Sequence, residues 1–198
     1  QVLHHVQIGN DRRTPVVSLA ADAQGTIWAA TFGDGVYALD HTGTIRHYTA
    51  KDGLNNENVL SVRSAGDTLW FGTLGGVVGY WAGSFHPQTG PGSEFIYDVL
   101  PDRNGTIWAV SDGAGLLHGN ANGTMNGKTN GPVTYFSLVS DEKGNIWAAG
   151  PGTGLCRAAA DSVLCVGQGL APFAGDLFAL GLSGHHLLAF GGRGTMAY

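Results

Sequence analysis

Polar and aromatic residues stand at or near the glycine-rich turns of this 198-residue chain, where side chains are free to meet a ligand. Carboxylates, amides and a guanidinium can exchange hydrogen bonds with ligand hydroxyl groups, and an aromatic ring can stack on an apolar ligand face. The candidate binding residues are Phe32, Asp34, Asn55, Asn56, Glu57, Trp81, Asp112 and Arg193. Their polar groups suit neutral hydroxyls better than phosphate, so they predict an oligosaccharide or a similar small ligand. Trp81 is equally compatible with a ring packed at the edge of a sheet.

No constellation typical of catalysis accompanies these candidates. The adjacent histidines His4–His5 and His185–His186 would point to opposite faces of a strand, so neither pair chelates one metal ion by itself. The sequence contains no His-x-x-x-His spacing, no Gly-x-Ser-x-Gly nucleophile turn and no P-loop. We therefore expect a protein that is not an enzyme and that needs no metal or cofactor.

A recurring motif, Asp-x-x-Gly-x-Ile-Trp, organises the chain. It occurs at 22–28, 102–108 and 141–147, and a reduced copy ends at Trp70, so the tryptophans are 42, 38 and 39 residues apart. At a tight turn the Asp can accept backbone amides while the Gly takes a positive φ. We interpret the repeated residues as structural, the Asp as turn formers and the Trp as packing between units. They are Asp22, Asp102 and Asp141, with Trp28, Trp70, Trp108 and Trp147.

A repeat of about 40 residues with four short strands predicts an all-β fold, a β-propeller of four-stranded antiparallel blades. We place about five blades in a single domain, 1–198. Their approximate ranges are 16–49, 59–87, 95–126, 135–166 and 176–198 with 1–8. Residues 1–8 align with a fourth strand and 194–198 with a third, so we expect the N-terminal strand to close the ring in the last blade. The loops from second to third strand would then gather with the connectors on one face and unite the candidate binding residues.

The amino-acid composition limits the classes of partner that the chain is expected to bind. Gly supplies 33 residues at regular turn positions, which indicates many short strands and not disorder. Charged residues are only 13% and the net charge is −5, with no basic run, so we expect no nucleic-acid partner. No apolar stretch approaches the roughly 18 residues of a membrane helix, so we expect no membrane insertion by this chain.

Cys156 and Cys165 are placed to form a disulfide. A two-residue turn at 160–161 would set them directly opposite each other on the third and fourth strands of their blade. The alternative is a pair of free buried thiols. A disulfide would favour an oxidising compartment.

The most regular part of the chain resembles the two-component regulator propeller repeat. The matching residues are Tyr48-x-x-x-Asp52-Gly53-Leu54, then Val59-x-x-Val62, then Leu69-Trp70-Phe71-Gly72-Thr73. The likeness extends over nearly the whole chain. It implies a periplasmic or extracellular sensor region of a hybrid histidine kinase, with further domains of a longer protein as partners. Self-association is expected if the ring is open.

Two alternatives to the sensor remain. The blades also resemble those of streptogramin lyases, and an enzyme of that type would bring a His and a Glu together at the channel mouth. A protein-interaction scaffold would instead expose a hydrophobic patch on one face.

Overall fold

The computed structural model describes residues 6–9, 14–90, 95–120, 125–127, 133–158, 162–166, 176–192 and 194–197. These residues form five antiparallel sheets. The first two are β1 (Val16–Ala21), β2 (Ile27–Thr31), β3 (Val36–Leu39) and β4 (Ile45–Tyr48), then β5 (Val59–Ala65), β6 (Thr68–Thr73), β7 (Gly76–Trp81) and β8 (Ser84–Pro87). The third and fourth are β9 (Ile96–Pro101), β10 (Ile107–Ser111), β11 (Gly115–Gly119) and β12 (Asn126–Gly127), then β13 (Ser137–Ser140), β14 (Ile146–Gly150), β15 (Gly154–Ala158) and β16 (Val163–Val166). The last is β17 (Leu177–Ser183), β18 (His186–Gly191) and β19 (Gly194–Ala197). We call them blades 1 to 5.

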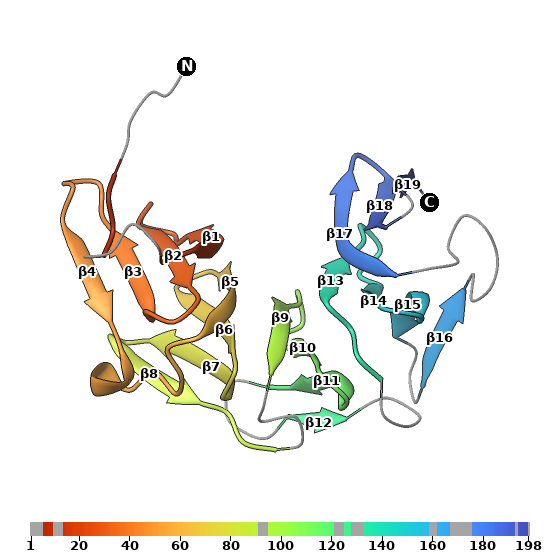
Figure 1. Cartoon of the computed structure of the whole chain (residues 1–198), viewed down its shortest axis with the longest axis horizontal. Coiled ribbons are helices and arrows are strands. Elements are labelled where there is room, and N and C mark those ends of the chain that lie inside the picture. Colours follow the sequence, from red (N-terminus) through yellow and green to blue (C-terminus); the bar gives the residue numbers. More distant parts are fainter. Residues whose placement is uncertain are drawn as a thin grey trace.

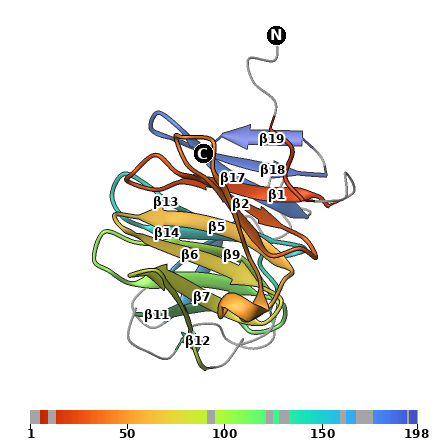
Figure 2. The ribbon, with the colours of Figure 1, turned by 90° about the vertical axis from the view of Figure 1, so that its left-hand side faces the viewer.

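The blades follow one another along an arc (Figure 1). Their first strands contact each other in chain order, β1 with β5, β5 with β9, β9 with β13 and β13 with β17. Blades 1 and 5 lie at the two separate ends of the arc, and Figure 2 views the molecule from the side of blade 1. We call the side with the second-to-third strand turns and the connectors the loop side. The side with the first-to-second strand turns is the turn side. The all-β prediction with repeated antiparallel blades is confirmed.

The repeated motif builds each turn in the same way. Asp22 Oδ1 accepts hydrogen bonds from the backbone amides of Gln24 at 3.0 Å and Thr26 at 2.8 Å, and Gly25 takes a φ of 80°. Asp22 Oδ2 accepts the indole N–H of Trp28 at 2.8 Å. The corresponding indole bonds measure 3.0 Å to Asp102 and 2.9 Å to Asp141. One carboxylate therefore shapes the turn and also fixes the rotamer of the tryptophan that follows.

The core is divided among the interfaces between blades. Trp28 packs with Phe71 and Val78 between blades 1 and 2. Trp70, Trp108 and Trp147 occupy the same position in the next three interfaces. Each blade thus covers an apolar face of its neighbour, as stacked repeats must.

Hydrogen bonds between first strands reinforce three of these interfaces. The hydroxyl of Ser18 accepts the amide of Val62 at 3.1 Å, and the hydroxyl of Ser137 accepts that of Leu180 at 3.0 Å. Asp98 holds the equivalent position in blade 3, and its carboxylate accepts the amide of Leu138 at 3.1 Å. In blade 2 the equivalent hydroxyl is that of Ser61, and it is buried without a hydrogen-bond partner among the described residues.

The two end blades expose faces that are buried elsewhere. Leu19 of β1 is 63% exposed, whereas Val62 at the same repeat position in blade 2 is 1% exposed. At the other end, Phe190 is 39% exposed, whereas the residues at the same repeat position in blades 1 and 4, Ala30 and Ala149, are completely buried. The arc therefore ends in one aliphatic and one partly aromatic face.

The predicted closing strand is not shown. Residues 6–8 form no strand, so the prediction is wrong for them, and residues 1–5 lie outside the described residues. Gly9 lies so close to Asp34 and Tyr37 that a Cβ there would come within 3.2 Å of Asp34 Oδ2 and of Tyr37 Oη. This short segment therefore lies against blade 1 and not beside β19, whose described partner is β18.

The predicted disulfide between Cys156 and Cys165 is confirmed. The two residues are direct partners in the β15–β16 register, with their Cα atoms 3.9 Å apart. Residues 160–161, where we placed the turn, lie outside the described residues.

Candidate functional site

The loop side of blades 1 and 2 gathers most of the predicted binding residues. The turn at 32–35 lies on the connector that leads into β5, because the amides of Gly33 and Gly35 both donate to the carbonyl of Glu57, at 3.2 and 2.9 Å. Phe32 forms a β-bridge with Asn58, while its side chain stays 46% exposed. An apolar ring is thus held beside polar groups on a fixed backbone.

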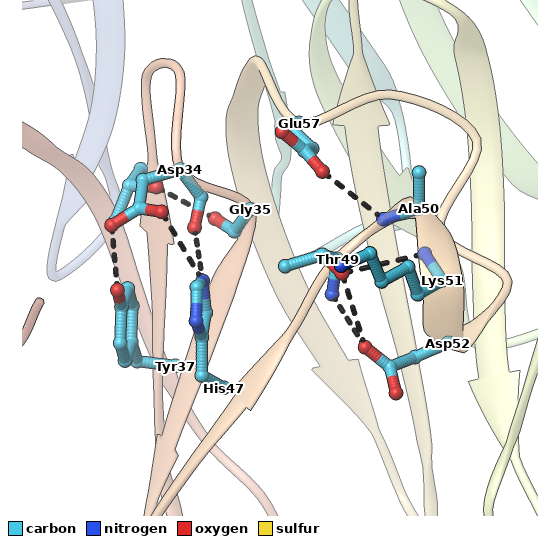
Figure 3. A network of polar contacts seen from close by, with 10 residues as sticks. Asp34, Gly35, Tyr37, His47, Thr49, Ala50, Lys51, Asp52 and Glu57 are labelled. Atoms are coloured by element: carbon cyan, nitrogen blue, oxygen red, sulfur yellow. Dashed lines mark hydrogen bonds and ion pairs between the residues drawn. The ribbon is translucent and has the colours of Figure 1, made fainter.

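Asp34 is the centre of a polar cluster on blade 1 (Figure 3). Tyr37 Oη donates to Asp34 Oδ2 at 2.6 Å, and His47 Nε2 donates to the Asp34 carbonyl at 2.7 Å. A carbonyl oxygen can only accept, so His47 Nε2 carries the proton and Nδ1 can accept from a ligand in the neutral ring. The rings of Tyr37 and His47 stack with centroids 4.2 Å apart. The cluster thus presents a partly exposed carboxylate beside a partly exposed imidazole.

The phenol of Tyr37 remains protonated at physiological pH. Burial raises its pKa, and the hydrogen bond and negative charge of Asp34 raise it further. Tyr37 therefore acts as a permanent donor that orients Asp34.

A short 3-10 turn, η1 (Ala50–Asp52), shapes the connector (Figure 3). Asp52 Oδ2 accepts the backbone amide of Thr49 at 2.8 Å, and the hydroxyl of Thr49 accepts the amide of Lys51 at 3.3 Å. Glu57 accepts the amide of Ala50 at 3.4 Å. The carboxylate of Glu57 thus lies over the connector and is exposed to solvent.

The two predicted asparagines use their amides within the fold. Asn55 donates to the carbonyl of Gly75 at 2.9 Å and accepts the hydroxyl of Thr73 at 3.0 Å. The side-chain oxygen of Asn56 accepts the backbone amide of Asn58 at 2.8 Å. Asn55 therefore fixes the connector against the loop of blade 2, and Asn56 shapes the connector itself.

The remaining predicted residues lie elsewhere. Asp112 is on the corresponding loop of blade 3, where it accepts the hydroxyl of Thr134 at 2.7 Å. Trp81 ends β7 on the turn side, stacked on His86 with centroids 3.8 Å apart and packed against Trp70. It is therefore a packed edge residue, the alternative that the sequence left open. Arg193 lies outside the described residues.

The ion pair between Arg63 and Asp98 was not predicted from the sequence. Arg63 Nη2 lies 3.1 and 3.3 Å from the two carboxylate oxygens of Asp98. Burial raises the pKa of Asp98, and Arg63 and two backbone amides oppose that shift. The signal was present, since an Asp stands here where the neighbouring repeats carry Ser61 and Ser137.

The described residues offer one close His–Glu pair. It joins His185 to Glu142, which lie on the turn side and not at the mouth of the loop side. Within the same part of the chain, no three His, Cys, Asp or Glu side chains gather as a metal site would require. None of the described segments forms an apolar helix of the length that a bilayer demands.

Solved structures with this arrangement of blades include large extracellular domains. The extracellular domain of the putative one component system BT4673 from B. thetaiotaomicron matches 97% of this chain, with a TM-score of 0.80 and 19% identity. The WD40 β-propeller domain of Doa1 matches 92% of the chain, with a TM-score of 0.66 and 9% identity. The fold is that of a β-propeller. The extracellular domain of the putative hybrid two component system BT3049 from B. thetaiotaomicron matches 94% of the chain, with a TM-score of 0.74 and 20% identity. This chain spans only 28% and 27% of the lengths of the two B. thetaiotaomicron chains.

An enzyme shares the fold as well. A catalytically inactive virginiamycin B lyase from Staphylococcus aureus, solved with quinupristin, matches 96% of this propeller at 14% identity, with a TM-score of 0.73. The match covers 71% of the lyase chain. Neither a protein-family model nor a curated protein sequence matches this chain. At these identities the comparisons establish the fold of the propeller.

Proposed function

We propose that this propeller is a non-catalytic ligand-binding module, the extracytoplasmic sensor part of a longer protein, and that it recognises an oligosaccharide on the loop side of blades 1 and 2. The observation that carries the proposal is the exposed ring of Phe32 held two residues from the Asp34–Tyr37–His47 cluster. A ring beside oriented donors and acceptors is the usual way in which proteins bind the mixed faces of sugars.

The sensor role and the location have separate support. Two of the solved chains that share the fold are named as extracellular domains of one- and two-component systems. The disulfide between Cys156 and Cys165 fits an oxidising compartment, whether periplasmic or extracellular.

Calorimetric titration with a panel of neutral oligosaccharides tests the binding site. We expect Phe32→Ala to weaken the binding of a responding sugar by about threefold to tenfold, the value of one stacking contact. Asp34→Asn should weaken it further, because it removes the charge that accepts from Tyr37 and that lies 3.3 Å from His47 Nε2. Phe178→Ala serves as the control, since it removes an equally exposed ring from blade 5. Absence of heat with every oligosaccharide would refute the sugar proposal.

A lyase is the second candidate, and the observation that favours it is the shared fold of the virginiamycin B lyase. The close His–Glu pair of the described residues, His185–Glu142, lies on the turn side. Incubation of the same panel, together with a cyclic ester substrate, distinguishes the two functions. New products that disappear in a His185→Ala variant would establish an enzyme, whereas binding without turnover supports the sensor.

A further inference from the structure

A groove on the turn side separates blades 4 and 5 and lies away from the loop-side site. It encloses about 430 Å³. Blade 4 contributes the turn that begins at Asp141, together with Trp147 and Arg157, and blade 5 contributes Leu182 and His185. A volume of this size accommodates a monosaccharide or a molecule slightly larger.

The more buried carboxylate in the groove, that of Asp141, is already engaged. Asp141 accepts four hydrogen bonds, from the amides of Lys143 and Asn145, from the Asn145 side chain and from the indole of Trp147. Glu142 pairs with His185 across the two blades. The carboxylate of Asp141 is therefore satisfied within the protein.

The donors, in contrast, are available. The guanidinium carbon of Arg157 lies 5.9 Å from the centre of the Trp147 ring, which holds the side chain over the groove. Lys143 lines the same space. Among the described residues, the ion pairs involve Arg63, His47 and His185, and neither Arg157 nor Lys143 takes part in one. Two cationic groups thus face the groove with unused hydrogen-bonding capacity.

The groove also has an apolar wall. Leu182 of β17 is 43% exposed. Its neighbours, Leu180 on the same strand and Leu187 on β18, pack toward blade 4 instead. The equivalent first-strand positions in blades 2 and 4 carry Ser64 and Ser140. A large apolar side chain at this position supplies a surface for the C–H face of a ligand.

We propose that this groove binds a hexuronate, a sugar whose carboxylate meets Arg157 and Lys143 while its C–H face covers Leu182. The guanidinium provides two parallel donors for a carboxylate, the geometry of the strongest charge-assisted pairs. The groove is separate from the loop-side site, so an experiment can refute one binding proposal and leave the other intact.

Titration with glucuronate, glucose and benzoate tests the assignment. We expect glucuronate to bind, glucose to bind at least tenfold more weakly because it lacks the carboxylate, and added salt to weaken glucuronate binding. Glucose that binds as well as glucuronate, or benzoate that binds better, would overturn the hexuronate assignment. No binding of glucuronate would also overturn it.

Variants locate the binding in the groove. Arg157→Met keeps the packing on Trp147 but removes the charge, and we expect it to weaken glucuronate binding at least tenfold. Lys143→Gln changes an exposed side chain and should weaken it severalfold without affecting folding. The matched control is Arg46→Met, which removes an exposed cation from blade 1. An equal loss in Arg46→Met, or none in the two groove variants, would refute the site.

Discussion

The guanidinium of Arg63 in blade 2 and the carboxylate of Asp98 in blade 3 form an ion pair, with Nη2 at 3.1 Å from Oδ2, at a position where the neighbouring repeats place a serine. Asp98 also accepts the amide of Leu138, so one buried carboxylate connects three blades.

Removal of the Asp98 carboxylate should destabilise the propeller. We expect Asp98→Ala to lower the free energy of unfolding by about 2–4 kcal/mol, because the amide of Leu138 is left buried without an acceptor. Asp98→Ser is the informative control, since Ser18 and Ser137 accept the equivalent backbone amide of the following blade. It should recover most of the loss in urea unfolding. A serine variant as unstable as the alanine variant would show that the ion pair outweighs the amide bond.

The turn carboxylate Asp141 should make stability depend on pH. Burial opposes its ionisation, but hydrogen bonds from Trp147, Asn145 and Lys143 outweigh that effect and hold its pKa below the ordinary 3.8. An acid with a lowered folded pKa stabilises the fold above its unfolded pKa and loses that contribution as the pH falls through the folded pKa.

We therefore expect Asp141→Asn to cost about 1 kcal/mol at pH 7 and progressively less below pH 4, where the wild-type group also becomes neutral. Urea unfolding at pH 7, 5 and 3 measures the difference. A gap for Asp141→Asn that stays constant with pH would contradict the assigned direction of the shift.

Reduction of the disulfide should weaken blade 4. The bond closes a loop of about ten residues, so the chain-entropy estimate for its loss is about 2–3 kcal/mol. The midpoint of urea unfolding should fall on addition of dithiothreitol, and a Cys156→Ala, Cys165→Ala double variant should not respond to the reductant. If complete reduction left the wild-type midpoint unchanged, the disulfide would not contribute to the stability of the fold.

The exposed ends of the arc should promote self-association. Leu19 and Phe190 present apolar surface that the inner blades bury, and a second copy can cover it by stacking end to end. Sedimentation velocity should show a weight-average mass that rises with concentration. Leu19→Glu should suppress the rise without loss of stability, whereas Val62→Glu, at the equivalent buried position, should unfold the protein. A single monomeric species at every concentration would contradict this expectation.

The repeat made the blades and the cysteine pairing predictable, because strand pairing within a hairpin depends only on local register. The same register pairs Tyr37 with His47, so that part of the Asp34 cluster was within reach of sequence analysis. Closure was not. An unpaired third strand accepts any suitable fourth strand, and alignment alone does not say which segment reaches it.

The position of Trp81 escaped prediction for a different reason. Its spacing departs from the repeat, which marks it as unusual without saying which end of the blade it occupies. Only the direction of β7 places it on the turn side. The contacts of Asp98 likewise depend on two other blades, so no single repeat contains the information that explains them.

Among the described residues the hydroxyl of Ser61 has no hydrogen-bond partner, so the four interfaces between blades are not bonded alike. In a one-dimensional array, cooperativity is transmitted only through nearest-neighbour couplings, and the unit separates where the coupling is weakest. The first-strand couplings of blades 1–2, 3–4 and 4–5 include a hydrogen bond to a backbone amide, which salt does not screen. The coupling of blades 2–3 uses a half-exposed guanidinium instead, and dissolved ions compete for it. Ionic strength should therefore weaken the first-strand contact between blades 2 and 3 more than the corresponding contacts of the other three interfaces, a difference that the repeat itself does not reveal.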